Sequence, residues 1–151
     1  MTTTNAAFRV TRRVLGAPTV GPFLALLLAM AFFSYKSDVF LEGQNLSLVL
    51  QQVMVVGVLA IGQTFVILTA GIDLSCGTVM AFGQIVMTKL AVAEGVDPLL
   101  AIALGIAACV CFGLLNGVFV AGVGLPAFIV TLGTLNIAFA LTHVYSNDET
   151  Y

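Results

Sequence analysis

The chain has 151 residues, of which 60% are hydrophobic and 8% charged, with a mean hydropathy of +1.14 and a formal net charge of −2. A soluble core of this size could not bury so many apolar side chains, so the composition indicates a protein that crosses a membrane several times. The few cations are spread along the chain and form no basic stripe, which excludes nucleic-acid binding.

Residues 1–13 form a polar N-terminal tail whose arginines come just before the first apolar block. Cations beside a membrane segment tend to stay in the cytoplasm, so we expect a cytoplasmic N-terminus. The uncharged block 14–35 is long for a signal peptide and leads into bulky residues instead of a small-residue cleavage site. We predict that it is the first membrane helix, beginning near Pro18 or Pro22.

The next uncharged block, residues 43–72, exceeds one perpendicular crossing, because 30 residues would span about 45 Å at ~1.5 Å per residue. It must therefore tilt, kink or end early. A third crossing of minimal length is predicted at residues 74–93. Lys89, near its far end, can extend its amine to the membrane interface.

A very tight break at Gly71–Ser75 separates the second and third crossings. Gly71 suits a helix C-cap, and Asp73 or Ser75 suits an N-cap, where a side-chain oxygen satisfies backbone amides that lipid cannot. Because a charge at membrane depth is costly, the alternative is that Asp73 lines or gates a solute path. We favour the cap. Spacing leaves open whether the break reaches the cytoplasmic interface or is re-entrant within protein.

The uncharged run 98–147 is long enough for two further crossings, separated by a Gly- and Pro-containing break at residues 122–126. The fourth helix, about residues 99–121, carries a small residue at every fourth position. Such a row lets another helix approach closely. Its glycines are Gly105, Gly113 and Gly117, with the last two at the centre of the row. The fifth helix is expected at residues 126–145.

These elements predict an all-α, polytopic transmembrane bundle of about five membrane segments. It would have a cytoplasmic tail at 1–13, a membrane region at 14–145 and a polar end at 146–151. The sequence has one histidine, no glycine-rich phosphate loop before a lysine, and no cysteine spacing typical of a redox pair or metal site. We therefore expect no enzyme activity, no cofactor and no metal. If ATP powers the protein, another polypeptide binds it.

Several uncharged polar side chains lie within the predicted membrane segments. They either form hydrogen bonds between helices or line a path, and the sequence leaves both interpretations open. Amides and hydroxyls would suit a polyhydroxylated solute such as a sugar better than an ion. The residues concerned are Gln63, Thr64, Thr131 and Asn136.

Three segments resemble the permease subunit of ribose-type ABC importers. They are GQTFVILTAGIDLS at 62–75, LLNGVFVA at 114–121 and LPAFIVTLGTL at 125–135, in that family's order and spacing. The resemblance covers about residues 10–145. It adds Ser75 and Asn116, which lie in the matching segments, to Asp73 and the other polar residues as candidates for a translocation path or its gate.

The resemblance implies a subunit of the bacterial inner membrane that pairs with a second permease copy. A cytoplasmic ATP-binding subunit and a periplasmic sugar-binding protein would complete the importer, which would move a ribose-like monosaccharide into the cell. Two small departures occur: Ala70 stands where the family often has glycine, and Cys76 where it usually has valine. Full members are longer, and this chain ends where their first half would, so we expect a fragment or truncated product that does not transport alone.

Two alternatives belong to different classes. A small self-assembling channel or half of a secondary transporter would transport without ATP. A non-functional membrane remnant would be degraded or would aggregate, because the small-residue row of the fourth helix would lack its partners.

Overall fold

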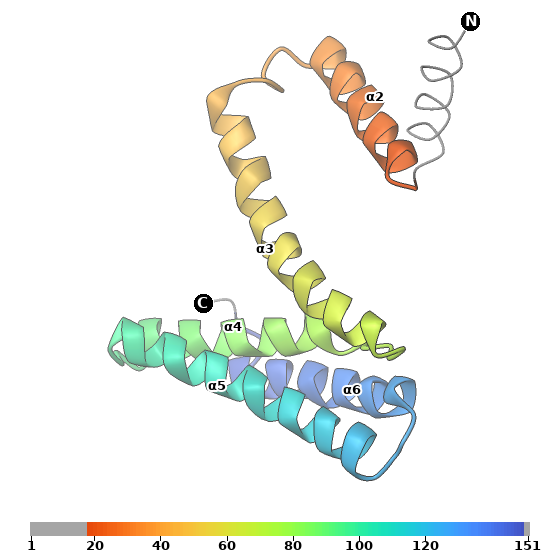
Figure 1. Cartoon of the computed structure of the whole chain (residues 1–151). Coiled ribbons are helices and arrows are strands. Elements are labelled where there is room, and N and C mark those ends of the chain that lie inside the picture. Colours follow the sequence, from red (N-terminus) through yellow and green to blue (C-terminus); the bar gives the residue numbers. More distant parts are fainter. Residues whose placement is uncertain (1–17, 150–151) are drawn as a thin grey trace, which may run out of the picture. The chain divides into compact units, whose positions relative to one another are not determined.

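The computed structural model describes residues 18–149, which are mostly helical and contain no strand. This confirms the all-α prediction. The predicted tail 1–13, the start of the predicted first helix and residues 150–151 of the polar end lie outside the described residues. The helices are α2 (Val20–Lys36), α3 (Gly43–Leu68), α4 (Cys76–Val92), α5 (Pro98–Gly117), a π-helical turn η1 (Val118–Gly122) and α6 (Ala127–Ser146) (Figure 1).

Three of the described helices are long and apolar enough to cross a membrane: α3 with 26 residues, α5 continued by η1 with 25, and α6 with 20. The apolar helices α2 and α4 have 17 residues each. At ~1.5 Å per residue they extend about 25 Å, slightly less than the ~30 Å hydrocarbon core. The 43–72 block ends early, at Leu68, and α4 is shorter than the predicted 74–93 because residues 72–75 are not helical.

The chain divides into two compact units, residues 1–55 and 56–151. In the first, a short loop follows α2 and leads into α3. The ring of Phe33 stacks on that of Phe40 in this loop, with centroids 5.7 Å apart, and the amide of Asn45 donates a hydrogen bond to the Phe40 carbonyl at 2.7 Å. These contacts fix the local connection between α2 and α3. The candidate site lies entirely in the second unit.

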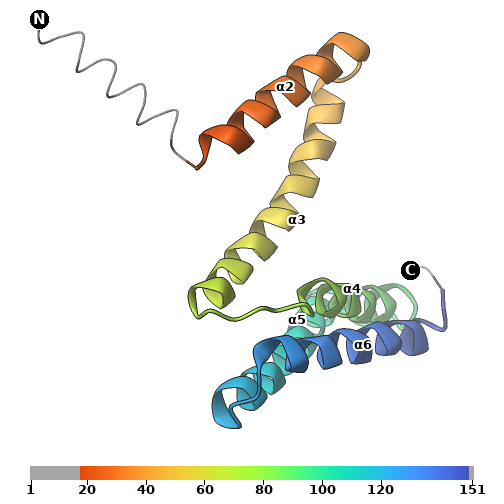
Figure 2. The same ribbon diagram turned by 90° about the vertical axis from the view of Figure 1, so that its right-hand side faces the viewer.

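In the second unit, α5 and α6 both pack on α4 and contact each other much less (Figures 1 and 2). The α5 helix begins at a capped turn, in which the Asp97 carboxylate accepts hydrogen bonds from the backbone amides of Leu99 and Leu100, with Pro98 in the first helical turn. A Pro in this position needs no amide partner, so the sequence Asp-Pro starts the helix efficiently.

The closest approach of α4 and α5 is at Gly83 and Gly105. A Cβ atom added to Gly105 would lie 2.7 Å from the carbonyl oxygen of Gly83. At Gly113 and Gly117 a Cβ would meet no atom within 4 Å. The sequence predicted Gly113 and Gly117 as the centre of the packing row, whereas the described chain makes its close contact at Gly105. Because four residues exceed the 3.6-residue turn, the row winds around α5 and only part of it faces α4.

The other end of α4 is joined to α6 through Lys89. Its amine donates a hydrogen bond to the carbonyl of Tyr145 at 2.7 Å and lies 4.5 Å from the centroid of the Tyr145 ring. The side chain thus joins the end of α4 to the end of α6, and its position at a membrane interface stays a prediction. Phe82 of α4 packs edge-on against both Phe112 of α5 and Tyr145. These contacts hold the three helices together.

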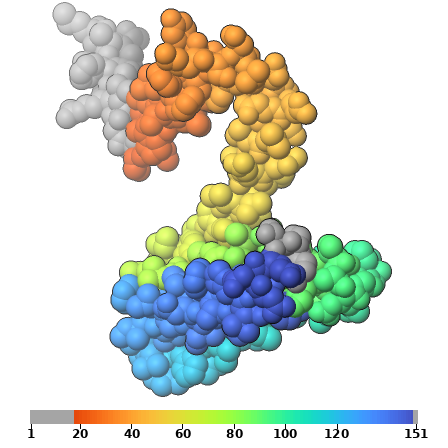
Figure 3. All heavy atoms as spheres, turned by 180° about the vertical axis from the view of Figure 1, so that it is seen from behind, coloured from red at the N-terminus to blue at the C-terminus, as the bar shows by residue number. Residues whose placement is uncertain are grey.

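Most large apolar side chains of the described residues point outward, including Leu28, Val58 and Val144 at 70%, 71% and 73% exposure. The fully buried apolar residues, Ala101 and Ala138, are small. Figure 3 shows α6, in dark blue, on the near face of the second unit. An apolar exterior around a core of small residues is what a membrane bundle requires, because lipid solvates the large side chains and small ones allow close packing.

Candidate functional site

The break between α3 and α4 begins with a Schellman cap. The amide of Gly71 donates to the Val66 carbonyl at 3.0 Å, and the amide of Ala70 donates to the Ile67 carbonyl at 2.9 Å. Ala70 has φ +57° and is the left-handed residue of the cap. The sequence indicated Gly71 for the C-cap because glycine prefers such positions. The left-handed residue is instead its neighbour, which carries a Cβ.

We expect Ala70→Gly to raise the free energy of unfolding by about 1 kcal/mol, because a left-handed conformation costs an L-residue roughly 1–2 kcal/mol. SDS titration followed by far-UV circular dichroism measures it, since the sequence contains no tryptophan. Thr69→Gly is the matched control: Thr69 has no positive φ, and its hydroxyl bonds the Val66 carbonyl. The control should destabilise, and stabilisation by both variants would contradict the explanation.

The carboxylate of Asp73 organises the start of α4. Its Oδ1 atom accepts two hydrogen bonds from Ser75, from the backbone amide and from the hydroxyl, each at 2.7 Å. Ser75 is the N-cap residue of α4, but its side chain caps no helix amide. The carboxylate of Asp73 therefore satisfies the backbone amide of the residue that precedes the helix, and no amide of α4 itself.

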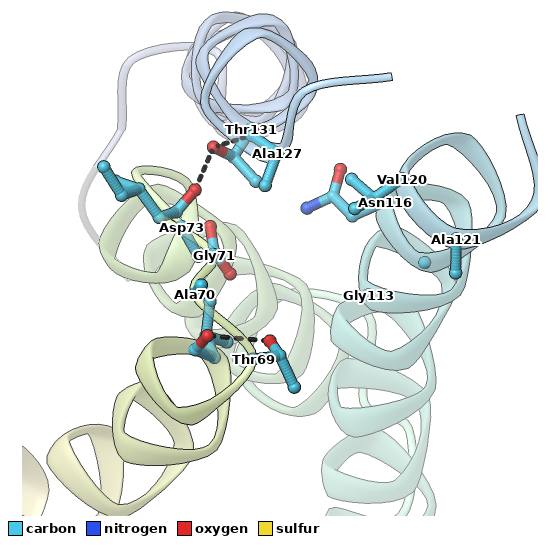
Figure 4. Close-up of a pocket in the computed structure, with 13 residues that line it drawn as sticks. Thr69, Ala70, Gly71, Asp73, Gly113, Asn116, Val120, Ala121, Ala127 and Thr131 are labelled. Atoms are coloured by element: carbon cyan, nitrogen blue, oxygen red, sulfur yellow. Dashed lines mark hydrogen bonds between the residues drawn. The ribbon is translucent and has the colours of Figure 1, made fainter. Parts of the chain in front are cut away.

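Two other side chains hold the break in place from neighbouring helices. The amide of Gln63 on α3 donates to the Asp73 carbonyl at 3.0 Å. The hydroxyl of Thr131 on α6 accepts from the Leu74 amide at 3.2 Å and lies 3.1 Å from the Ile72 carbonyl. Figure 4 shows this last contact as a dashed line. The Asp73 carbonyl and the Leu74 amide are thereby paired within protein, as non-helical backbone must be wherever it lies at membrane depth.

A buried polar network continues from Ser75 to α5 and α6. The Asn116 amide donates to the Ser75 hydroxyl at 3.1 Å, and its oxygen accepts from the hydroxyl of Thr134 at 2.5 Å. Ser75, at 1% exposure, Asn116 and Thr134 are all buried. The chain of contacts Asp73–Ser75–Asn116–Thr134 therefore links one carboxylate, through neutral groups only, to two helices. We call these four residues the Asp73 network.

Beside the network lies a pocket of about 610 Å³. Its walls are the end of α3, the break, α5 with η1, and the start of α6 (Figure 4). Asp73, Asn116 and Thr131 supply polar groups, while Gly113 and Gly117 belong to the mostly apolar remainder of the lining.

The structure brings together most, though not all, of the residues that the sequence singled out. Gln63, Asp73, Ser75, Asn116 and Thr131 surround the break. Thr64 and Asn136 lie outside: both are exposed, and each bonds a carbonyl of its own helix, Ala60 and Leu132 respectively. Their role in a path stays a prediction, as does the packing role of Gly113 and Gly117.

Sequence reasoning missed Thr134 and Gly83. Thr134 follows Thr131 by three residues, a spacing that places both on one face of α6, so helix register was the available signal. Gly83 is one glycine within an apolar helix, and only the position of its partner Gly105 shows its importance.

The family model described as "branched-chain amino acid transport system / permease component" matches residues 45–150. That range includes the whole Asp73 network and all of the pocket lining. The chain belongs to this permease family. Together with its apolar helices, this makes it a multi-pass membrane protein.

Three curated relatives of the permease chain are named for sugars. It is 38% identical to the fructose import permease of Rhizobium meliloti over 89% of this chain and 38% of that protein. It is 40% identical to the ribose import permease of Bacillus subtilis over 86% of this chain and 40% of that protein. It is 39% identical to the D-allose transport permease of Escherichia coli over 84% of this chain and 39% of that protein. No solved structure matches it.

The permease chain spans about two fifths of the length of these relatives. The family match and the relatives confirm the resemblance that the segments around Gly-Ile-Asp-Leu-Ser indicated.

Proposed function

We propose that this permease chain serves an ATP-driven importer that moves a monosaccharide into the cell. The observation that carries the proposal is the similarity, over more than four fifths of this chain, to permeases named for fructose, ribose and allose. The site supports it: neutral amides and hydroxyls around one carboxylate can exchange hydrogen bonds with sugar hydroxyls. Asp73, Asn116 and Thr131 would line the path, with Gln63 and Ser75 holding the break.

The same proposal includes the partners and the orientation. A second permease copy would complete the path, a cytoplasmic subunit would bind and hydrolyse ATP, and a periplasmic binding protein would deliver the sugar. The resemblance of residues 62–75, 114–121 and 125–135 to ribose-type importers supports these partners. The arginines of the 1–13 tail support a cytoplasmic N-terminus in a bacterial inner membrane, with residues 14–145 as the membrane region.

Uptake in native cells tests the proposal. Cells with and without the gene that encodes this chain are given radiolabelled D-ribose, D-fructose, D-allose or L-leucine. Loss of the gene should abolish high-affinity uptake of at least one of the sugars, and depletion of ATP should do the same. Leucine is included because the family description names branched-chain amino acids. Loss of leucine uptake with unchanged sugar uptake would overturn the sugar assignment.

A further inference from the structure

The carboxylate of Asp73 uses only one of its two oxygens within the described residues. Both hydrogen bonds from Ser75 end on Oδ1, and no hydrogen bond from the described residues reaches Oδ2. Nor is Oδ2 sealed inside the protein, since no buried side-chain oxygen or nitrogen of the described residues lacks a partner. A carboxylate can accept about four hydrogen bonds, so the capacity of Asp73 is half used.

Asp73 lines the pocket, together with Asn116 of α5 and Thr131 of α6 (Figure 4). The hydroxyl of Thr131 is already used within the protein, because it accepts a hydrogen bond from the Leu74 amide and has the Ile72 and Ala127 carbonyls as acceptors for its own hydrogen. Asn116 keeps one amide hydrogen and one oxygen lone pair beyond its bonds to Ser75 and Thr134. The pocket thus offers a charged acceptor and a neutral donor and acceptor.

The rest of the lining suits the apolar C–H face of a sugar ring. On the wall formed by α5 and η1, the small residues Gly113, Gly117 and Ala121 leave space for the ring. Val66 and Val120 add apolar surface. A volume of about 610 Å³ falls in the ~300–1,000 Å³ range of small-molecule sites. A metal ion fits the donor set poorly, because the described residues contain no group of three His, Cys, Asp or Glu side chains that could hold one.

We propose that this pocket binds a monosaccharide, with Oδ2 of Asp73 accepting a hydrogen bond from a sugar hydroxyl and Asn116 pairing with a neighbouring sugar oxygen. Ser75 and Gln63 are positioning residues: the first occupies Oδ1 and the second holds the Asp73 carbonyl, so together they fix the direction of the carboxylate. This inference rests on the proposed function and adds to it a binding site in the membrane protein itself.

Thiol labelling of the complete native permease, reconstituted in lipid nanodiscs, tests the site directly. Cys76, Cys109 and Cys111 are first replaced by alanine, and Ala121→Cys then places one thiol in the pocket wall. D-ribose, D-fructose or D-allose, whichever the cells take up, should slow the reaction with a maleimide. Ala93→Cys, exposed just after α4 beside the polar loop 94–98 and absent from the pocket lining, is the matched control and should react at an unchanged rate.

The decisive variant is Asp73→Asn, which keeps an acceptor for Ser75 and removes the charge. It should need about 10- to 100-fold more sugar for equal protection, as expected when a hydrogen bond to a charged acceptor is lost. Equal protection with and without the substitution, or no protection by any transported sugar, overturns the proposal.

A second measurement leaves Asp73 unchanged and so does not depend on how the variant folds. Singly deoxygenated forms of the protecting sugar are compared in the Ala121→Cys protein. At least one should protect about 10- to 100-fold less well, because it lacks the hydroxyl that donates to Oδ2. Equal protection by every deoxy form overturns the proposal. Normal sugar uptake without pocket protection defeats this inference alone, whereas absence of sugar uptake defeats the proposed function.

Discussion

A leucine side chain at Gly105 should force α4 and α5 apart and lower the free energy of unfolding by about 3 kcal/mol, at the upper end of the range for overpacked cores. A Cβ at this position would already lie 2.7 Å from the Gly83 carbonyl oxygen and 2.9 Å from Cε of Met87. Met87 can change rotamer, but the carbonyl is backbone and can retreat only if the helices separate. SDS titration followed by circular dichroism measures the loss.

Gly113→Leu is the matched control for this prediction. It adds the same side chain to the same helix, at a position where a Cβ meets no atom within 4 Å. The stability of the second unit should therefore be unchanged or slightly higher, because leucine favours helix over glycine by up to ~1 kcal/mol. If both substitutions were equally costly, the close approach at Gly105 would not explain the effect. Retained stability in Gly105→Leu would contradict the packing directly.

The sequence was sufficient to predict the helices, since uncharged apolar blocks of the observed lengths leave few alternatives in a membrane. The sequence was less informative about the residues at which the helices end. The cap at the end of α3 was expected at Gly71, because left-handed cap positions prefer glycine. The left-handed residue is instead the preceding one, Ala70. Likewise, the row of small residues on α5 predicts a close helix contact, but only the placement of α4 selects Gly105.

For the candidate site, too, the sequence identified some residues correctly and others not. Asp73, Ser75 and Asn116 were picked out by charge and by resemblance, and they meet in one network. Asn136 was chosen for its chemistry alone and lies outside. It is five residues from Thr131, more than one helical turn, whereas Thr134 is three residues away and shares the buried face. Considering helix register would have favoured Thr134 over Asn136 as a candidate. The pairing of Thr134 with Asn116, however, depends on tertiary packing.

Replacing Asn116 by leucine should lower the free energy of unfolding by about 2–3 kcal/mol, although the two side chains are similar in size. Ser75 would lose the amide that donates to its hydroxyl, and the Thr134 hydroxyl would keep only the Val130 carbonyl as an acceptor, while Asn116 itself disappears. All three residues are buried, so water cannot replace these partners without entering the unit. Leaving a buried polar group unpaired costs about 1–3 kcal/mol.

A double-mutant cycle separates the broken network from a simple loss of packing. Thr134→Val removes the hydroxyl that donates to Asn116, and its own cost should be about 1 kcal/mol because the amide oxygen is left without that donor. Once Asn116 is leucine, the same change should cost almost nothing, since the Thr134 hydroxyl no longer has an acceptor on α5. The expected coupling energy is therefore about 1 kcal/mol.

Asn136→Ala, which removes an exposed amide bonded only within α6, should show no coupling to Asn116. Additive costs for Asn116 and Thr134 would mean that the contact contributes nothing to the unit, and that α5 and α6 are held to the break by Ser75 and Thr131 alone.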